Sequence, residues 1–141
     1  MSENQWIWRC DRMIPSDTGI GREVMEEVLD QLQSHHWMEH DVFSVRLAME
    51  EALVNAITHG NRLDTSKRIR ICCDIAPEVI RIEITDEGEG FDPFSVPDPT
   101  SPEGRIRVGG RGVMLMKHFM SRVEYNDSGN TVVMEKEQAK E

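Results

Sequence analysis

The sequence has few of the features that mark secreted or membrane-spanning proteins. It contains only three cysteines, Cys10, Cys72 and Cys73, an odd number that suits neither a disulfide framework nor a zinc site with paired ligand spacing. No segment approaches the roughly 20 consecutive apolar residues of a membrane-spanning helix, and residues 1–8 lack the basic and apolar regions of a secretion signal. We therefore expect a cytoplasmic protein with reduced cysteines and no membrane contact.

Positive charge is also scarce. The chain has 16 Lys and Arg residues against 26 Asp and Glu residues, a net charge of −10. This balance argues against a protein that binds nucleic acid or an anionic membrane, because both need a basic surface. An acidic protein that binds a polyphosphate must instead supply a metal ion or local positive potential. At 141 residues, the chain is expected to form a single domain.

Several well-known nucleotide-binding motifs are absent. The chain has no Gly-Lys-Ser or Gly-Lys-Thr of a Walker-type loop, and it lacks the signatures of eukaryotic-type kinases. Its glycine motifs do not follow the βαβ unit that a dinucleotide fingerprint requires. Any nucleotide site must therefore be of another kind.

The most informative stretch is a predicted helix over about 41–59, rich in helix formers and without Gly or Pro before Gly60. An apolar stripe repeats in it every four residues, at Val45, Met49, Leu53 and Ile57. Glu51, Asn55 and His59 form a second line about 160° away from that stripe, at ~100° per residue, beside small alanines. This line is either a solvated polar face or a ligand-binding face that combines a carboxylate with a carboxamide.

Apolar periodicity predicts the other elements. We expect strands near 6–14, 68–73, 79–85, 121–127 and 130–136, helices near 17–34 and from Gly109–Gly112 to about 119, and a frayed end from Gln138. Residues 91–108 have no periodicity and contain four prolines, which predicts a long, lid-like loop. This order favours an α+β fold, a two-layer sandwich with helices on one face of the sheet.

Two glycine motifs accompany the helix. Asp86-x-Gly88-x-Gly90 ends a predicted strand, where glycines admit a flat ligand and the carboxylate can accept a hydrogen bond from an exocyclic amine; the alternative is an ordinary acidic turn. Gly109-Gly110-x-Gly112 opens a helix, where free N–H groups and the helix dipole favour an anion; the alternative is a plain loop-to-helix turn.

Taken in order, these motifs resemble the GHKL superfamily, the ATP-binding domain of gyrase, Hsp90, histidine kinases and MutL. The resemblance covers about residues 41–136. The Glu51–Ala56 stretch, His59-Gly60-Asn61 and the terminal Gly129–Met134 stretch are most similar to the bacterial anti-sigma factor serine/threonine kinases of the anti-sigma B and anti-sigma F type. The resemblance implies a Bergerat ATP-binding fold with a mixed, mostly antiparallel sheet. It also implies one ATP-binding kinase domain over 1–141, with a flexible lid at about 91–109.

The resemblance also implies roles for individual residues. Glu51 corresponds to the catalytic general base, and Asn55 to the ligand of Mg²⁺. Asp86 corresponds to the acceptor for the adenine amine. The remaining ATP-binding positions implied are Gly88, Gly90, Gly110, Arg111, Gly112, Val113 and Thr131. Arg105, Arg107 and Arg111 are candidates for a cation near the transferred phosphoryl group, although solvated arginines explain them equally well.

The implied activity is ATP-dependent phosphorylation of a serine or threonine on a small anti-anti-sigma (STAS-like) partner, with Mg²⁺ as cofactor. A sigma factor is a second implied partner, and the family resemblance allows a homodimer. The alternative is a nucleotide-gated module that sequesters a sigma factor or another regulator with little catalysis. A histidine kinase catalytic domain is disfavoured, because residues 1–40 contain one convincing helix rather than a helical phosphoacceptor domain.

Overall fold

The computed structural model describes residues 5–88 and 110–139. Within them the elements follow the order predicted from the periodicity. They are β1 (Trp8–Pro15), α1 (Thr18–Ser34), α2 (Glu39–Val54), η1 (Asn55–Gly60), β2 (Arg68–Ile75), β3 (Val79–Thr85), α4 (Gly110–Phe119), β4 (Arg122–Tyr125) and β5 (Thr131–Glu137). The predicted lid lies outside the described residues.

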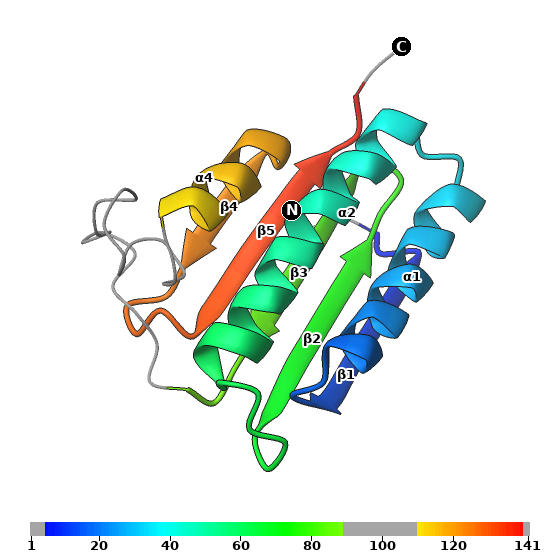
Figure 1. Ribbon diagram of the computed structural model, residues 1–141. Coiled ribbons are helices and arrows are strands. Elements are labelled where there is room, and N and C mark those ends of the chain that lie inside the picture. The colour runs from blue at the N-terminus through cyan, green and yellow to red at the C-terminus, as the bar shows by residue number, and fades with distance from the viewer. Residues whose placement is uncertain (1–4, 89–109, 140–141) are drawn as a thin grey trace.

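The strands form one sheet in the order β1-β2-β3-β5-β4, and every pairing in it is antiparallel. Helices α1, α2 and α4 cover one face of this sheet (Figure 1). The molecule is therefore the predicted two-layer α+β sandwich. Because β5 pairs with β3, Thr131 lies directly opposite Thr85 in the register, at the end of β3 from which the chain continues into Asp86.

The core lies between the sheet and the helices, as the alternation of apolar residues predicts. Ile80, Ile82 and Ile84 of β3 point into it and are at most 1% exposed. The apolar stripe of α2 faces them and continues into η1; its members Val45, Met49, Leu53 and Ile57 are all buried. The predicted stripe is confirmed, and it fixes which side of this helix faces away from the sheet.

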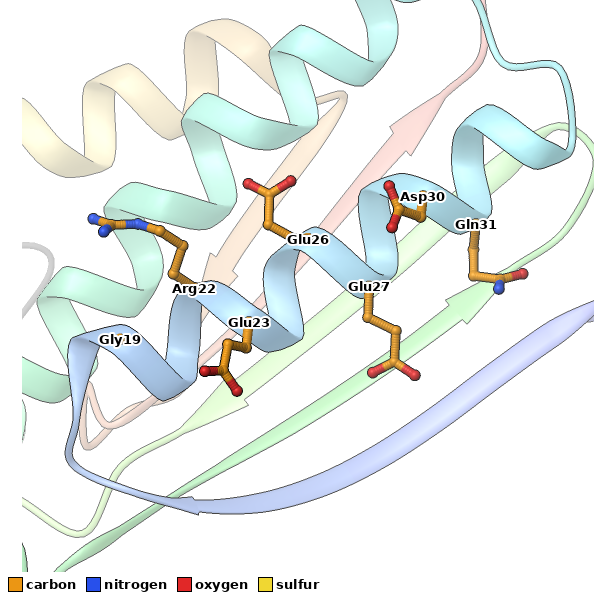
Figure 2. Close-up of a pocket in the computed structure, with 7 residues that line it drawn as sticks. All are labelled: Gly19, Arg22, Glu23, Glu26, Glu27, Asp30 and Gln31. Carbon is orange, nitrogen blue, oxygen red and sulfur yellow. The ribbon is translucent and has the colours of Figure 1, made fainter.

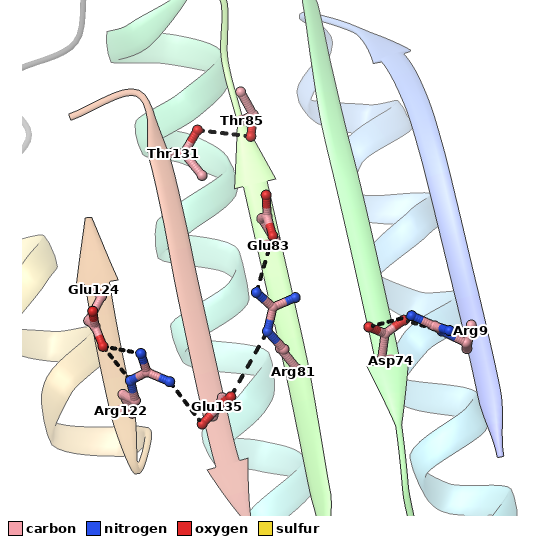
Figure 3. Close-up of polar contacts among 9 residues, drawn as sticks. All are labelled: Arg9, Asp74, Arg81, Glu83, Thr85, Arg122, Glu124, Thr131 and Glu135. Atoms are coloured by element: carbon pink, nitrogen blue, oxygen red, sulfur yellow. Dashed lines mark hydrogen bonds and ion pairs between the residues drawn. The ribbon is translucent and has the colours of Figure 1, made fainter. Parts of the chain in front are cut away.

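The opposite face of the sheet carries charged side chains instead of helices. Arg9 and Asp74 form an ion pair at 3.0 Å across β1 and β2, and Arg81 links Glu83 at 3.4 Å to Glu135 at 4.0 Å (Figure 3). Apart from the buried Asp74, these groups are partly or fully open to solvent, and such ion pairs each contribute little to stability. They do explain why helices cover only one face, because the side chains that alternate with the core residues are hydrophilic.

The end of the described chain is anchored, and the predicted fraying from Gln138 is therefore wrong for residues 138 and 139. The Gln138 N–H donates to the carbonyl oxygen of Glu78 at 2.8 Å, and the Ala139 N–H donates to the buried Asp41 carboxylate at 2.8 Å. A sequence pattern does not reveal these contacts, because both partners are distant in the chain.

The cysteines are free thiols, and adjacent Cys72 and Cys73 point to opposite sides of β2 as alternation requires. Cys73 is fully buried opposite Cys10 in the register. None of the helices within 5–88 and 110–139 is long and apolar enough to cross a membrane.

Candidate functional site

The candidate site begins where α2 changes its helical form. From Asn55 to Gly60 the chain continues as a π-helix, and the Asn61 N–H donates to the carbonyl oxygen of Ala56, five residues earlier, at 2.9 Å. π-Helical turns are rare in proteins as a whole, and those that do occur are often found at functional sites. The change places Asn55 at the junction of the two helical forms, one turn after Glu51.

Glu51 and Asn55 face the first turn of α4. A Cβ atom placed on Gly112 would lie 2.7 Å from Glu51 Oε2 and 3.2 Å from Asn55 Nδ2, which is closer than side chains normally pack. Glycine at this position therefore lets α4 begin against these two side chains without displacing either of them. The structure thus brings together two of the three segments that the sequence analysis linked.

Glu51 is half-buried, and its burial raises the pKa of its carboxyl group. His59 opposes this shift and Glu50 adds to it. A carboxylate with a raised pKa holds a proton more strongly, and so accepts one from a nucleophile more readily, than an ordinary surface glutamate does. The environment of Glu51 is therefore suited to a general base.

Asn55 is 6% exposed, and its Nδ2 atom has no hydrogen-bond partner among the described residues. A buried amide left without a partner costs about 1–3 kcal/mol, so such groups usually face a ligand, a water molecule or an ion. The Asn55 side chain interacts with the Tyr125 hydroxyl and lowers its pKa. An amide here can present its oxygen to Mg²⁺ or its nitrogen to a phosphate oxygen.

Tyr125 is a member of this cluster that the sequence analysis did not single out. Burial raises the pKa of Tyr125 to about 12, the Asn55 amide opposes that rise, and the Asp86 and Glu51 carboxylates add to it. The hydroxyl is therefore within electrostatic range of both acidic positions that the motifs identified. The sequence signal that could have identified Tyr125 is its two-residue spacing from Val123 on β4. This spacing places both side chains on the side of the sheet that the helices cover.

Asp86 lies at the end of β3 and is 7% exposed. Burial raises the pKa of its carboxyl group, while the Gly88 N–H and Lys67 oppose the shift. Gly88 donates to Asp86 Oδ1 at 2.8 Å, which holds the carboxylate in a tight turn. A buried carboxylate in this fixed orientation offers its remaining oxygen to a donor such as an exocyclic amine.

The Asp86 turn packs directly against the end of η1. A Cβ atom on Gly60 would lie 2.5 Å from Asp86 Cγ and Oδ2, and one on Gly88 would lie 1.9 Å from the Gly60 carbonyl oxygen. A side chain at Gly60 would displace the Asp86 carboxylate, and one at Gly88 would require a backbone shift. Gly60, predicted only as a helix stop, therefore also allows the close approach of Asp86.

Thr131 lies beside this turn on β5. Its Oγ1 atom is 3.0 Å from Thr85 Oγ1 (Figure 3), and the Asp86 N–H donates to the carbonyl oxygen of Asn130 at 2.9 Å. The half-buried Thr131 hydroxyl is therefore placed near Asp86. This is the neighbourhood that the family resemblance implies for it.

The remaining predicted site residues differ in what the structure shows. Gly90, like Arg105 and Arg107, lies outside the described residues. Gly110 begins α4, but its surroundings and the Arg111 side chain are not described. Val113 is 7% exposed and belongs to the hydrophobic core cluster, so its side chain supports α4 from beneath.

The polar groups of the site are of the kinds that bind ATP and Mg²⁺. The residues at 5–88 and 110–139 contain no group of three or more His, Cys, Asp or Glu side chains that could hold a metal ion. Mg²⁺ does not need one, because it usually keeps several waters and binds phosphate oxygens with one or two protein ligands. The buried Asn55 amide and the bare N-terminal turn of α4 at Gly112 match that requirement.

Another hollow lies along the outer side of α1, lined by Gly19, Arg22, Glu23, Glu26, Glu27, Asp30 and Gln31 (Figure 2). Its acidic side chains would repel a polyphosphate. Two of them are already paired, Glu26 with Arg46 at 2.6 Å and Glu27 with Arg12 at 2.8 Å. We therefore assign the candidate site to the cluster around Glu51 and Asp86.

Comparisons with known proteins show which proteins this chain is similar to. A serine-protein kinase RsbW from Oceanobacillus iheyensis is 28% identical over 126 residues, which cover 85% of this chain and 78% of that protein. An RsbW from Staphylococcus epidermidis is 31% identical over 102 residues, 67% of this chain. The chain spans 64% of that relative's length, slightly less than two thirds.

A solved structure shares the fold. It is the crystal structure of the RsbU and RsbW domains of a Mycobacterium tuberculosis protein, with a TM-score of 0.65 and 15% identity over 95% of this chain and 33% of that one. The family model for the histidine kinase-like ATPase domain matches residues 14–136, which is most of the sequence. This chain therefore belongs to the histidine kinase-like ATPase domain family.

Proposed function

We propose that the protein is a serine/threonine kinase of the anti-sigma factor type, which binds Mg-ATP and phosphorylates a small STAS-like anti-anti-sigma partner. The observation that carries this proposal is the contact of Glu51 and Asn55 with the first turn of α4 at Gly112. It places a carboxylate of raised pKa beside a helix N-terminus, which favours anions. The names of the similar RsbW proteins support the kinase assignment.

The two ends of the site suit the two ends of ATP. Asp86, with Thr131 beside it, would accept the adenine amine. The N–H groups at the start of α4 would face the phosphates, and the Asn55 oxygen would be a ligand of Mg²⁺. The metal would supply positive charge to the phosphates, which answers the problem posed by a net charge of −10.

In the transfer step, Glu51 would accept the proton of the partner's serine or threonine hydroxyl. The hydroxyl oxygen then bonds to the γ-phosphorus as the bond from that phosphorus to the bridging oxygen of ADP breaks. Glu51 therefore acts on the nucleophile and makes little contribution to nucleotide affinity. We place this activity in the cytoplasm, where a sigma factor would be the second partner.

The test measures transfer of label from γ-labelled ATP to a STAS-like protein from the same genome, with ATP binding measured in parallel. We expect wild type to label the partner, and Glu51→Gln to lower that rate by about 100-fold or more while ATP affinity changes little. Glu50→Gln is the matched control, because Glu50 is the exposed neighbour. Its rate is expected to equal that of wild type.

The other outcomes are equally informative. If wild type binds ATP without labelling any partner, the protein is a nucleotide-gated binding module. If Glu51→Gln loses binding and transfer to the same degree, Glu51 is not the base.

A further inference from the structure

The side chain of Asn61 connects the two halves of the candidate site. It is the first residue after η1 and is 1% exposed. Its Nδ2 atom donates to Ser16 Oγ at 2.9 Å and to the carbonyl oxygen of Arg68 at 3.0 Å, and its Oδ1 atom accepts from the Glu87 N–H at 2.8 Å. An asparagine amide has two N–H donors, so both are used here.

These bonds reach three segments that are separate in the sequence. Ser16 follows β1, Arg68 begins β2, and Glu87 follows Asp86 in the turn after β3. The two donor bonds hold the Asn61 amide plane against the β1 and β2 ends. The amide oxygen is thereby held in place, and it accepts the bond from the Asp86 turn.

The fixed oxygen sets the backbone of the Asp86 turn. The Glu87 N–H is the peptide group directly after Asp86, so its direction determines how the turn leaves β3. The next N–H, of Gly88, donates to Asp86 Oδ1. The bond from the Glu87 N–H to Asn61 therefore orients the peptide group between Asp86 and Glu87. The next peptide group, between Glu87 and Gly88, carries the N–H that holds the Asp86 carboxylate.

The packing between η1 and the turn leaves no room for another arrangement. Gly60, next to Asn61, lies against the Asp86 carboxylate, and the Gly60 carbonyl lies against Gly88. Asn61 thus adds a side-chain hydrogen bond to a contact made by the Gly60 and Gly88 backbone and the Asp86 carboxylate. We propose that Asn61 is a positioning residue that orients Asp86 and so determines the preference for adenine, an inference that rests on the proposed ATP site.

The test compares the dissociation constants for ATP and GTP in wild type, Asn61→Ala and Ser16→Ala, with thermal unfolding of each. Ser16→Ala removes two bonds, the one that Ser16 Oγ accepts from Asn61 and the one that it donates to the carbonyl oxygen of Lys67 at 2.9 Å. It leaves the bonds of Asn61 to Arg68 and Glu87 in place, so it is the matched control for loss of stability alone. We expect Asn61→Ala to weaken ATP about tenfold with GTP nearly unchanged. Ser16→Ala should leave the ratio within about twofold of wild type.

Each result decides between the alternatives. If wild type shows no preference for ATP, the proposed adenine site fails. If wild type has the preference and a folded Asn61→Ala keeps it, or loses both nucleotides equally, only the role of Asn61 fails. Should Asn61→Ala not fold, hydrogen exchange of the wild-type Glu87 amide decides: slowing by ATP supports the proposal, and unchanged exchange overturns it.

Discussion

Replacing Gly112 by alanine tests the geometry of the site without removing any functional group. The new Cβ atom would lie 2.7 Å from Glu51 Oε2 and 3.3 Å from Glu51 Cδ. Ordinary contact begins at 3.4 Å, so the carboxylate would have to move by about 0.7 Å. Because Glu51 is a flexible side chain, it can make this movement, and the backbone of α4 need not shift.

The two expected effects have different sizes. A displacement of about 1 Å at a reacting group can cost about 100-fold in rate, equal to about 2.7 kcal/mol in the barrier. Stability should change by about 1 kcal/mol or less, because alanine is favoured over glycine in a helix by roughly that amount and offsets part of the crowding. The Gly112 backbone is not in the left-handed region, so alanine adds no strain there.

The assay is single-turnover transfer from labelled ATP, with thermal unfolding of the same samples. Gly19→Ala is the matched control, because Gly19 lies in the first turn of the exposed end of α1, where its Cβ would meet only Asp17. A Gly112→Ala protein that transfers at the wild-type rate would refute the contact with Glu51. Equal losses in both variants would show that glycine replacement acts through the fold.

Three further predictions concern the base site, the pH dependence and the core. Asp86→Asn should weaken ATP about tenfold relative to GTP, measured by competition binding; unchanged selectivity would remove Asp86 from base recognition. Because burial raises the pKa of Glu51, its ionised form destabilises the folded state above that pKa, and the contribution disappears below the ordinary value of 4.5. Glu51→Gln should therefore raise the melting temperature at pH 7.5 and not at pH 4; equal shifts at both would contradict this. Ile82→Ala should cost about 2–5 kcal/mol in denaturant unfolding, whereas Ile7→Ala, at an exposed position, should stay within about 0.5 kcal/mol.

The sequence predicted the fold well because the signals were local. Alternation in 79–85 and the four-residue stripe from Val45 to Ile57 each follow from which side chains face the core. The family motifs also predicted that Glu51 and Asp86 would contribute to one site. In the structure, both carboxylates raise the pKa of Tyr125.

The features that were not predicted depend on contacts between distant residues. An α-helical pattern continues unchanged through Asn55–Gly60, so nothing in the periodicity marks the change to a π-helix. Asn61 was visible only as part of a family motif, because its bonds to Ser16 and Glu87 span 45 and 26 residues. Tyr125 likewise reaches the site only when β4 pairs with β5.

The pairing of β5 with β3 has a consequence for how the protein acquires its activity. Residues on α2, after β3 and on α4 are far apart in the chain and meet only in the folded arrangement of sheet and helices. If the proposed nucleotide site is correct, nucleotide should therefore bind the native state alone, adding about 2.7 kcal/mol to stability at a concentration of 100 times its dissociation constant. In a cell, the nucleotide supply would then influence how much of the folded protein survives.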